Sequence, residues 1–178
     1  MRKGDGTIKA RLVVQGCQEK NVNIRSDAPT GSALSFWTTL AFAAQPGWGL
    51  RGYDAKSAYL QSEGIDRTLL LRMPGAEPPP GTVPWQVVQA LGAIYGTKDA
   101  GRAWYQHLRT RLHKEGWQES ALERCLFIRR DQRGRVCSVL FVHVDDLLIA
   151  HKLGDKSLEE HFSRLETMFH LDRRDGDK

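Results

Sequence analysis

Two adjacent aspartates, Asp145 and Asp146, interrupt the most apolar stretch of the sequence, residues 136–150. The flanking runs are rich in β-branched residues and predict a β-hairpin with both carboxylates at its tip. Two-residue hairpin loops favour Asn-Gly or Asp-Gly, because glycine adopts a positive φ at little cost, so turn geometry alone does not explain two acids. Adjacent carboxylates repel each other unless a cation lies between them, and Mg²⁺ takes oxygen ligands from carboxylates and substrate phosphates. The pair therefore indicates a metal site, and a solvated turn is the alternative.

A third acid, Asp54, ends a predicted strand at residues 48–54, far from the pair in sequence. A carboxylate at the carboxyl end of a strand is well placed to reach a ligand. The alternative is an aspartate favoured by the dipole at the start of the helix that follows. A single metal site requires the hairpin to bring Asp145 and Asp146 within metal-bridging reach of Asp54, whereas the alternatives do not require the acids to meet.

Basic side chains are the other candidates for chemistry. The formal net charge of +5 favours an anionic partner such as nucleic acid. Lys9 and Arg11 lie on one face of a predicted strand at residues 8–15, from which they could hold a triphosphate. A predicted helix at residues 97–116 has a basic face that could follow a phosphate backbone, with the cations Lys98, Arg102, Arg109, Arg111 and Lys114. Solvated faces are the alternative for both elements.

The elements that must position these residues are a mixture of helices and strands. Ser32 is placed to cap a helix that ends before Pro46, and the 97–116 helix has an apolar side formed by residues at spacing i, i+4 and i+8. A capping box at residues 157–160 opens a third helix. Further strands are predicted at residues 69–73, 85–90 and 125–130. This order predicts a single α+β domain with a central antiparallel sheet packed on helices.

Composition excludes several classes of protein. Three cysteines without a C-x-x-C pair argue against a disulfide framework and a cysteine zinc site, and fit a reducing intracellular compartment. No apolar run approaches the roughly 18 residues that span a bilayer, so we expect no membrane partner. A phosphoacceptor signalling domain would need alternating β and α units with a parallel sheet, and the hairpin at residues 136–150 argues against it.

Four segments in order resemble the reverse transcriptases of copia-type LTR retrotransposons. They are Lys-Ala-Arg-Leu-Val at residues 9–13, Asp-Ala-Lys-Ser-Ala-Tyr-Leu at 54–60, Tyr-Gly-Thr-Lys-Asp-Ala-Gly-Arg-Ala-Trp-Tyr at 95–105 and Val-Asp-Asp-Leu-Leu-Ile at 144–149. The resemblance covers nearly the whole chain, from about residue 9 to residue 169. It implies a polymerase-type palm built on the antiparallel sheet, with partial fingers and no thumb. Residues 1–50 and 61–105 would be fingers-like, and residues 51–60 and 106–178 palm-like.

The resemblance also implies the activity, that of an RNA-directed DNA polymerase core. Such an enzyme joins a deoxynucleoside triphosphate to a primer 3′-hydroxyl with two metal ions, Mg²⁺ or alternatively Mn²⁺. Asp54, Asp145 and Asp146 match the family's catalytic, metal-binding acids. Tyr59 matches the aromatic residue that excludes a 2′-hydroxyl on the incoming nucleotide.

Four further positions match nucleotide-binding segments of the family. Lys9 and Arg11 fall in the segment that faces the triphosphate, and Gly96 and Lys98 in the segment that contacts the template and the nucleotide pocket. The implied partners are an RNA or DNA template with its primer, deoxynucleoside triphosphates and the rest of a polyprotein, namely a thumb, a ribonuclease H and an integrase. The implied location is a cytoplasmic particle or the nucleus.

Three positions depart from the family pattern. His143 stands where the family usually has Tyr, Gly101 where it usually has Pro, and Asp99 adds an acid. The departures at His143 and Gly101 favour a second hypothesis, a catalytically decayed remnant that binds nucleic acid, whereas the three retained acids and Tyr59 favour an active polymerase. Because the thumb is missing, we expect the 178-residue chain alone to bind primer–template weakly, to dissociate after few additions and to self-associate.

Overall fold

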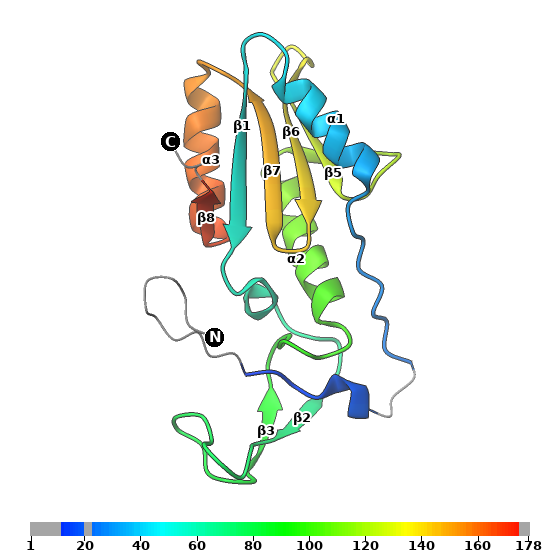
Figure 1. Cartoon of the computed structure of the whole chain (residues 1–178), viewed down its shortest axis with the longest axis vertical. Coiled ribbons are helices and arrows are strands. Elements are labelled where there is room, and N and C mark those ends of the chain that lie inside the picture. The colour runs from blue at the N-terminus through cyan, green and yellow to red at the C-terminus, as the bar shows by residue number, and fades with distance from the viewer. Residues whose placement is uncertain (1–11, 20–22, 175–178) are drawn as a thin grey trace.

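The computed structural model describes residues 12–19 and 23–174, and a six-stranded antiparallel sheet organises them (Figure 1). The strand order is β4-β5-β6-β7-β1-β8. The strands are β1 (Trp48–Ala55), β4 (Trp117–Glu119), β5 (Leu126–Arg130), β6 (Val136–His143), β7 (Asp146–Lys152) and β8 (Leu171–Arg174). The predicted α+β class with a central antiparallel sheet is therefore confirmed.

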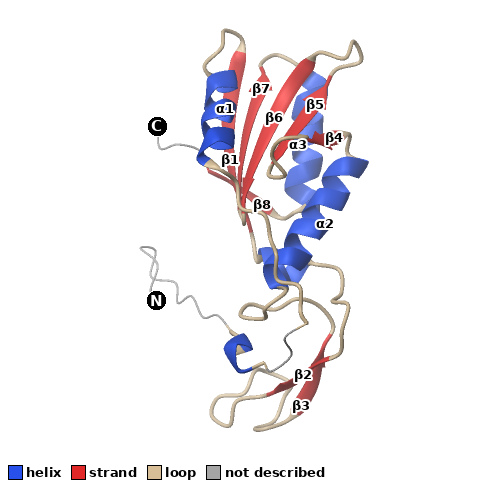
Figure 2. Cartoon of the chain, turned by 90° about the vertical axis from the view of Figure 1, so that its right-hand side faces the viewer, coloured by secondary structure: helices blue, strands red, loops and turns tan. Residues whose placement is uncertain are grey.

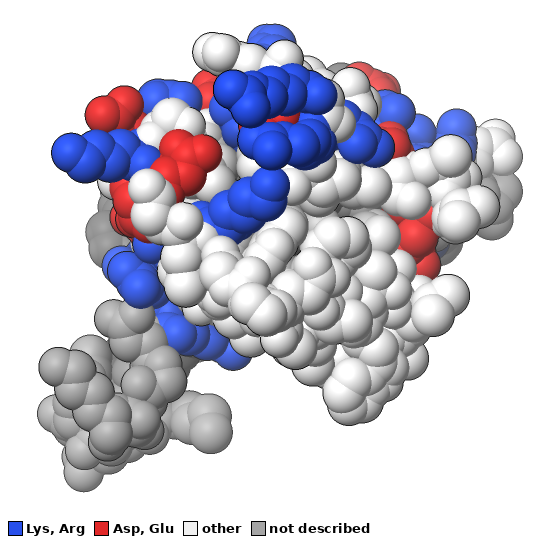
Figure 3. Space-filling view, turned by 90° about the horizontal axis from the view of Figure 1, so that it is seen from above, with Lys and Arg blue, Asp and Glu red and all other residues white. Residues whose placement is uncertain are grey.

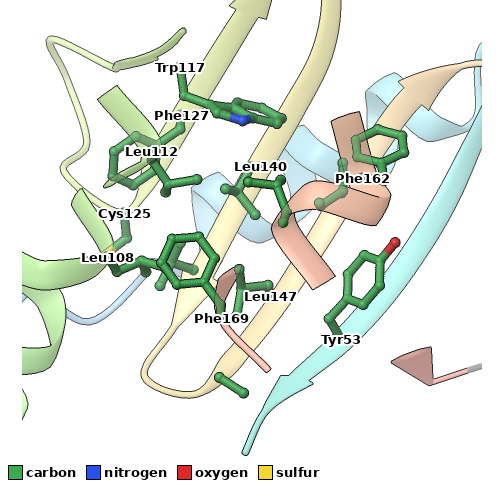
Figure 4. Close-up of a cluster of buried hydrophobic side chains, with 14 of the residues drawn as sticks. Tyr53, Leu108, Leu112, Trp117, Cys125, Phe127, Leu140, Leu147, Phe162 and Phe169 are labelled. Carbon is green, nitrogen blue, oxygen red and sulfur yellow. The ribbon is translucent and has the colours of Figure 1, made fainter. Parts of the chain in front are cut away.

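Three α-helices cover the two faces of the sheet. Helices α2 (Ala100–Lys114) and α3 (Lys156–Met168) lie on one face, and α1 (Ala33–Ala43) lies on the other (Figure 2). The larger core fills the α2 and α3 side, where Leu108 and Phe162 from these helices pack with Leu140 and Leu147 of the sheet (Figure 4). A smaller cluster around Phe141 packs against α1. The sheet is thus a middle layer with apolar side chains on both faces.

The predicted cap of α1 and the predicted apolar face of α2 are both present in the structure. Ser32 caps α1 by accepting a hydrogen bond from the Ser35 amide at 3.3 Å. Trp104, Leu108 and Leu112 of α2 are almost fully buried, as their i, i+4, i+8 spacing requires. Gly116 follows α2 with a φ of 83°, a conformation that glycine adopts at little cost.

The β6–β7 hairpin differs from its prediction by one residue. His143 pairs with Asp146, so the two-residue loop consists of Val144 and Asp145. Asp146 is therefore the first residue of β7, and the expectation that both carboxylates occupy the tip is wrong for Asp146. Val144 has a φ of 59°, which is unusual for a β-branched residue and indicates backbone strain at the turn.

A smaller unit lies beyond the end of the sheet at which the β6–β7 turn is found (Figures 1 and 2). It contains the two-stranded sheet of β2 (Leu69–Arg72) and β3 (Val87–Ala90) and the 3₁₀ helix η1 (Gly16–Gln18). The Val14 amide donates to the Tyr95 carbonyl at 2.8 Å, which ties the N-terminal segment to the chain before α2. A second 3₁₀ helix, η2 (Ala58–Gln61), follows β1.

Three expectations about elements need correction. The described part of the predicted strand at residues 8–15 is not a strand, and Lys9 and Arg11 lie outside the described residues. Helix α3 is capped by Asp155, whose carboxylate accepts from the Ser157 amide at 2.9 Å, so Ser157 lies in the first turn instead of capping it. Strands β4 and β8 were not predicted. Within residues 12–19 and 23–174 no helix has the length and apolar character needed to cross a bilayer.

Candidate functional site

Three carboxylates lie side by side across three adjacent strands. Asp54 of β1 is directly opposite Asp146 of β7 on one side and Asp172 of β8 on the other. Residues directly opposite each other in an antiparallel sheet direct their side chains to the same face, so the three acids share one face. Leu148, two residues after Asp146, belongs to the cluster beneath α1 and identifies that face. The acid row lies near the end of the sheet, where the Asp54 and Asp146 side chains are 37% and 47% exposed.

Asp145 reaches the same end of the sheet through its backbone. The Ala55 amide donates to the Asp145 carbonyl at 2.8 Å, which fixes the hairpin turn against the end of β1. The Trp104 indole Nε1 donates to the Val144 carbonyl at 2.7 Å, which ties the turn to α2. The structure therefore sets Asp146 directly opposite Asp54 and places the backbone of Asp145 at the end of β1, despite the separation of these residues along the chain.

Arg174 neutralises part of the acid row. Its Nη2 donates a hydrogen bond to Asp54 Oδ1 at 2.8 Å. The same nitrogen lies 2.8 Å from Asp146 Oδ1, but without hydrogen-bond geometry, and this buried carboxylate oxygen has no other donor among the described residues. The hydrogen bond to Asp54 and the charge of Asp146 raise the pKa of Arg174 above its usual value. The guanidinium thus contacts two of the three predicted metal-binding acids.

The donor set fits a hard divalent cation, although the side chains are not arranged around one. Carboxylate oxygens are the ligands that Mg²⁺ prefers, and Asp146 Oδ1 is a buried acceptor without a hydrogen bond. Among the residues that the structure describes, no three His, Cys, Asp or Glu side chains converge as a metal cluster. Asp54 and Asp146 contact Arg174 instead.

A pocket of about 470 Å³ adjoins the acid row on the α1 face. Asp146 and His143, which are directly opposite each other on β7 and β6, form part of its wall. Its other lining residues are Gly31, Ser32, Ala33, Phe36, Gly52, Tyr53, Phe141, Leu147, Leu148 and Arg174. The pocket therefore combines an apolar floor with charged groups at one edge.

The predicted nucleotide-binding residues that are described lie at the junction of the sheet and the smaller unit. Tyr59 of η2 packs its ring on Tyr95, with ring centroids 4.9 Å apart. Gly96 has a φ of 90°, and a Cβ atom there would lie 2.0 Å from the Val14 carbonyl oxygen. Lys98 Nζ donates to the Glu19 carbonyl at 2.7 Å. Gly96 and Lys98 thus both help to hold the N-terminal segment, which is a structural role the sequence did not reveal.

The predicted nucleic-acid-binding arginines each contact a carboxylate. Arg102 pairs with Asp27 at 2.9 Å, Arg109 with Glu119 at 2.5 Å, and Arg111 with Glu63. Arg102 and Arg111 line one groove of about 920 Å³, whereas Arg109 lines a different depression. These cations therefore do not form one continuous track.

The departures from the family pattern have local explanations in two cases. Asp99 pairs with Arg67, whose Nε lies 2.7 Å from its carboxylate, and this hydrogen bond lowers the pKa of Asp99. Gly101 approaches Ala28 closely, since an added Cβ would lie 3.3 Å from the Ala28 Cβ. His143 is exposed beside Asp146, and its ring centroid lies 6.4 Å from that of Phe141.

Sequence reasoning missed three residues of the site: Trp104 as a partner of the turn, Asp172 and Arg174. Asp172 and Arg174 lie in a strand whose described residues are mostly exposed, so no apolar alternation marked it. Trp104 was expected only as a core residue, and its indole bond to the turn depends on tertiary packing.

Comparisons with known proteins cover most of the chain. Residues 2–174 match a family model described as reverse transcriptase (RNA-dependent DNA polymerase). The chain is 34% identical over 154 residues to the Retrovirus-related Pol polyprotein from transposon RE2 of Arabidopsis thaliana, and the match covers 82% of the chain and 10% of that protein. It is 28% identical over 155 residues to the Transposon Ty1-DR5 Gag-Pol polyprotein of Saccharomyces cerevisiae, covering 85% of the chain and 8% of that protein. The chain thus spans about a tenth of the length of these relatives.

Proposed function

The chain belongs to the reverse transcriptase (RNA-dependent DNA polymerase) family, and we propose that it carries the catalytic acids of RNA-directed DNA synthesis. The resemblance to copia-type enzymes is confirmed by the same comparisons. In the proposed reaction a primer 3′-oxygen attacks the α-phosphorus of a deoxynucleoside triphosphate. The new phosphodiester bond forms as the bond to pyrophosphate breaks, and the hydroxyl proton is lost.

The observation that carries the proposal is the register of β1 and β7. It sets Asp54 directly opposite Asp146, and the Ala55 amide binds the backbone carbonyl of Asp145 at the same end of the sheet. Like charges directly opposite each other destabilise a sheet, so this arrangement calls for a functional reason. Cation binding supplies such a reason, because carboxylates that repel each other become joint ligands of a metal ion.

In this proposal Asp54, Asp145 and Asp146 would hold two Mg²⁺ ions, with Mn²⁺ as an alternative. When bound, the ions would activate the primer hydroxyl and stabilise the charge on the leaving pyrophosphate. The chain's own residues would position the acids, because the Ala55 amide and the Trp104 indole hold the β6–β7 turn against the end of β1. Positioning of this kind is the main contribution of protein to phosphoryl transfer.

We assign the nucleotide contacts by the matched segments of the family. Tyr59 would exclude a sugar 2′-hydroxyl, and Lys9, Arg11, Gly96 and Lys98 would lie near the triphosphate and template. Support comes from the location of Tyr59, on the 3₁₀ helix that follows β1 and Asp54. Residues 51–60 and 106–178 would form the palm, and residues 1–50 and 61–105 the fingers.

The proposed partners follow from the reaction and from the relatives. They are an RNA or DNA template with its primer, deoxynucleoside triphosphates and further parts of a Pol polyprotein. Arg102, Arg109 and Arg111 would contact the phosphate backbone after exchanging their present carboxylate partners. The second candidate, a remnant that binds nucleic acid without catalysis, is favoured by His143 beside Asp146, where the family usually has Tyr.

Primer extension on an RNA template with Mg²⁺ tests the proposal. We expect Asp145→Asn to lower the extension rate by about a hundred-fold or more, since a carboxylate that serves a metal in the transition state is lost. Glu160→Gln, which removes an exposed carboxylate of α3, is the matched control and should retain the wild-type rate. Equal rates for wild type and Asp145→Asn would contradict the assignment. Binding of primer–template without any extension by the wild type would support the non-catalytic remnant.

A further inference from the structure

The acid row contains a third carboxylate, Asp172, beside the predicted acids Asp54 and Asp146. Asp172, Asp54 and Asp146 occupy directly opposite positions on β8, β1 and β7. Lys56 Nζ lies 2.6 Å from Asp172 and neutralises that end of the row. Arg174 Nη2 contacts the other two carboxylates. Without a bound metal, the sheet therefore depends on these two cations to offset repulsion between neighbouring acids.

The sheet provides a direct path for Arg174 to reach the acids. Arg174 lies directly opposite Gly52 and two positions after Asp172 in β8, so its side chain emerges on the face of the acid row. Gly52 has no side chain to obstruct it, and a Cβ there would lie 3.6 Å from the Arg174 Cβ. Arg174 also lines the pocket that adjoins Asp146. The base of the Arg174 side chain thus lies beside Gly52, and its guanidinium extends to the Asp54 and Asp146 carboxylates.

The guanidinium and a bridging metal ion require the same oxygen atoms. Arg174 Nη2 lies 2.8 Å from Asp54 Oδ1 and 2.8 Å from Asp146 Oδ1. A Mg²⁺ ion bound to both oxygens would approach each to roughly 2.1 Å, which leaves no room for the nitrogen at its present place. Arg174 binds the two carboxylates only weakly, however, because Asp146 Oδ1 receives no hydrogen bond and the arginine side chain is 61% exposed. The arginine can therefore leave when a stronger cation arrives.

We propose that Arg174 is an internal counterion that occupies the space between Asp54 and Asp146 in the metal-free protein and that a divalent cation must displace to bind there. This inference rests on the proposed function, since it assumes that these acids are the metal ligands. It makes the edge strand β8 part of the metal site. The affinity for metal is then set by a competition within the chain as well as by the number of ligands.

Mn²⁺ binding to the whole 178-residue chain, measured by electron paramagnetic resonance at constant ionic strength, tests the competition. We expect Arg174→Gln to tighten Mn²⁺ binding by about three- to ten-fold, because an exposed ion pair contributes modestly. Lys56→Gln removes the same charge from the Asp172 end of the row and should change the affinity by less than about two-fold, since screening weakens charges that do not share the ligand oxygens. Asp146→Asn should weaken binding in both the wild-type and Arg174→Gln backgrounds.

Thermal unfolding gives a second readout that does not depend on activity. Without metal, Arg174→Gln should unfold at a lower temperature than the wild type, and saturating Mn²⁺ should raise its midpoint by more than it raises that of the wild type. Arg174→Lys, which keeps the charge, should lie between the two. Equal Mn²⁺ affinity in wild type and Arg174→Gln, with loss of binding in Asp146→Asn, would overturn the counterion and leave the proposed function intact. Mn²⁺ binding that is insensitive to Asp146→Asn would instead refute the metal site itself.

Discussion

The residues of the acid row and of the turn beside it destabilise the sheet locally. Asp54 has a carboxylate directly opposite it on each neighbouring strand, and the nearby Val144 has a positive φ that a β-branched residue rarely adopts. Strain and repulsion of this kind concentrate at functional sites, where the surrounding structure enforces them. Here the enforcing contacts are the Ala55 amide and the Trp104 indole, both of which hold the turn by its carbonyl groups.

Tyr59 gives the first prediction at this scale. If its ring excludes the 2′-hydroxyl, Tyr59→Ala should reduce discrimination against ribonucleotides by about 1–3 kcal/mol, a loss of roughly ten- to two-hundred-fold in the ratio of kcat/KM values. Tyr59→Phe keeps the ring and its packing on Tyr95 and should preserve discrimination. Steady-state incorporation of deoxy- and ribonucleotides measures both. Unchanged selectivity in an active Tyr59→Ala preparation would refute the assigned role.

Among the elements, the β6–β7 turn of the sheet is bound to helix α2 through Trp104. The Trp104 indole is almost fully buried in α2 and donates to the carbonyl of the strained Val144. Removing the donor leaves the carbonyl without its partner, which costs about 1–3 kcal/mol if water cannot replace it. We therefore expect Trp104 to act as a positioning residue for the adjacent Asp145.

Replacing Trp104 by Phe removes the hydrogen bond to the turn but keeps an aromatic ring in the core. We expect Trp104→Phe to lower the free energy of unfolding by about 1–3 kcal/mol and to lower kcat more than it raises KM, because the acids shift while substrate contacts remain. Leu112→Val, a core change in the same helix far from the turn, is the control for stability alone. A kcat equal to that of an equally destabilised Leu112→Val protein would show that Trp104 has a purely structural role.

His161 links α3 to β4 and predicts a pH dependence of stability. Its Nε2 accepts a hydrogen bond from the buried Trp117 indole at 2.9 Å, and burial, with the charges of Arg129 and Arg164, lowers its pKa to about 4. The Glu115 carboxylate oxygen Oε2 lies 3.5 Å from His161 Nδ1, on the other side of the ring from the indole. Because the folded pKa lies below the ordinary value of 6.5, His161 stabilises the fold fully above pH 6.5 and progressively less as the pH falls toward 4.

Chemical denaturation between pH 7 and pH 4 measures this effect. The wild type should lose up to about 1.4 kcal/mol per pH unit in that window from His161 alone. His161→Gln should be less stable at pH 7 but should show a shallower decline, whereas His143→Gln, at an exposed position, should follow the wild-type slope. An identical slope in His161→Gln would show that other groups cause the acid sensitivity.

How far the sequence could predict these features depended on the range of the contacts. The elements α1, α2, β1 and β7 followed from local periodicity and caps, and these elements position the acids. The pairing of Asp54 with Asp146 was required by the metal hypothesis, but no local signal sets a register between strands so distant in sequence. Strand β8 was missed because its exposed, charged residues show no apolar alternation, and with it Arg174. The cap of α3 was predicted at Ser157 because residues 157–160 match a capping box, whereas Asp155, two positions earlier, caps the helix.

The whole molecule distributes charge unevenly. Viewed from the end shown in Figure 3, lysine and arginine side chains, with some aspartate and glutamate among them, gather along one border beside a wide area formed mostly by other residues. Exposed apolar side chains include Leu34 and Trp37 of α1, which are 77% and 64% exposed. The net charge of +5 favours nucleic acid as a partner, but the arginines of α2 divide between two depressions.

Binding to primer–template should depend steeply on salt and little on sequence. Each phosphate contact contributes a slope of about −0.9 to a plot of log affinity against log salt concentration, so Arg102→Gln should reduce the magnitude of the slope by about one contact. Arg135→Gln, which removes a cation paired with Asp131 in the β5–β6 turn, should leave the slope unchanged. Fluorescence anisotropy at several salt concentrations gives the slopes. An affinity that does not change with salt would contradict a phosphate-dominated interface.

The central claim, that Asp146 is a metal ligand for nucleotidyl transfer, is tested most directly by changing the ligand atom. A cysteine thiolate binds Mg²⁺ poorly and softer metal ions well, so Asp146→Cys should lose primer extension with Mg²⁺ and regain it with Mn²⁺ or Cd²⁺. Asp146→Ala should not regain activity with any of these ions, and Asp172→Cys, in the same acid row, should remain active with Mg²⁺. An Asp146→Cys protein that extends the primer at the wild-type rate with Mg²⁺, or that responds to soft metals no better than Asp146→Ala, would contradict the account.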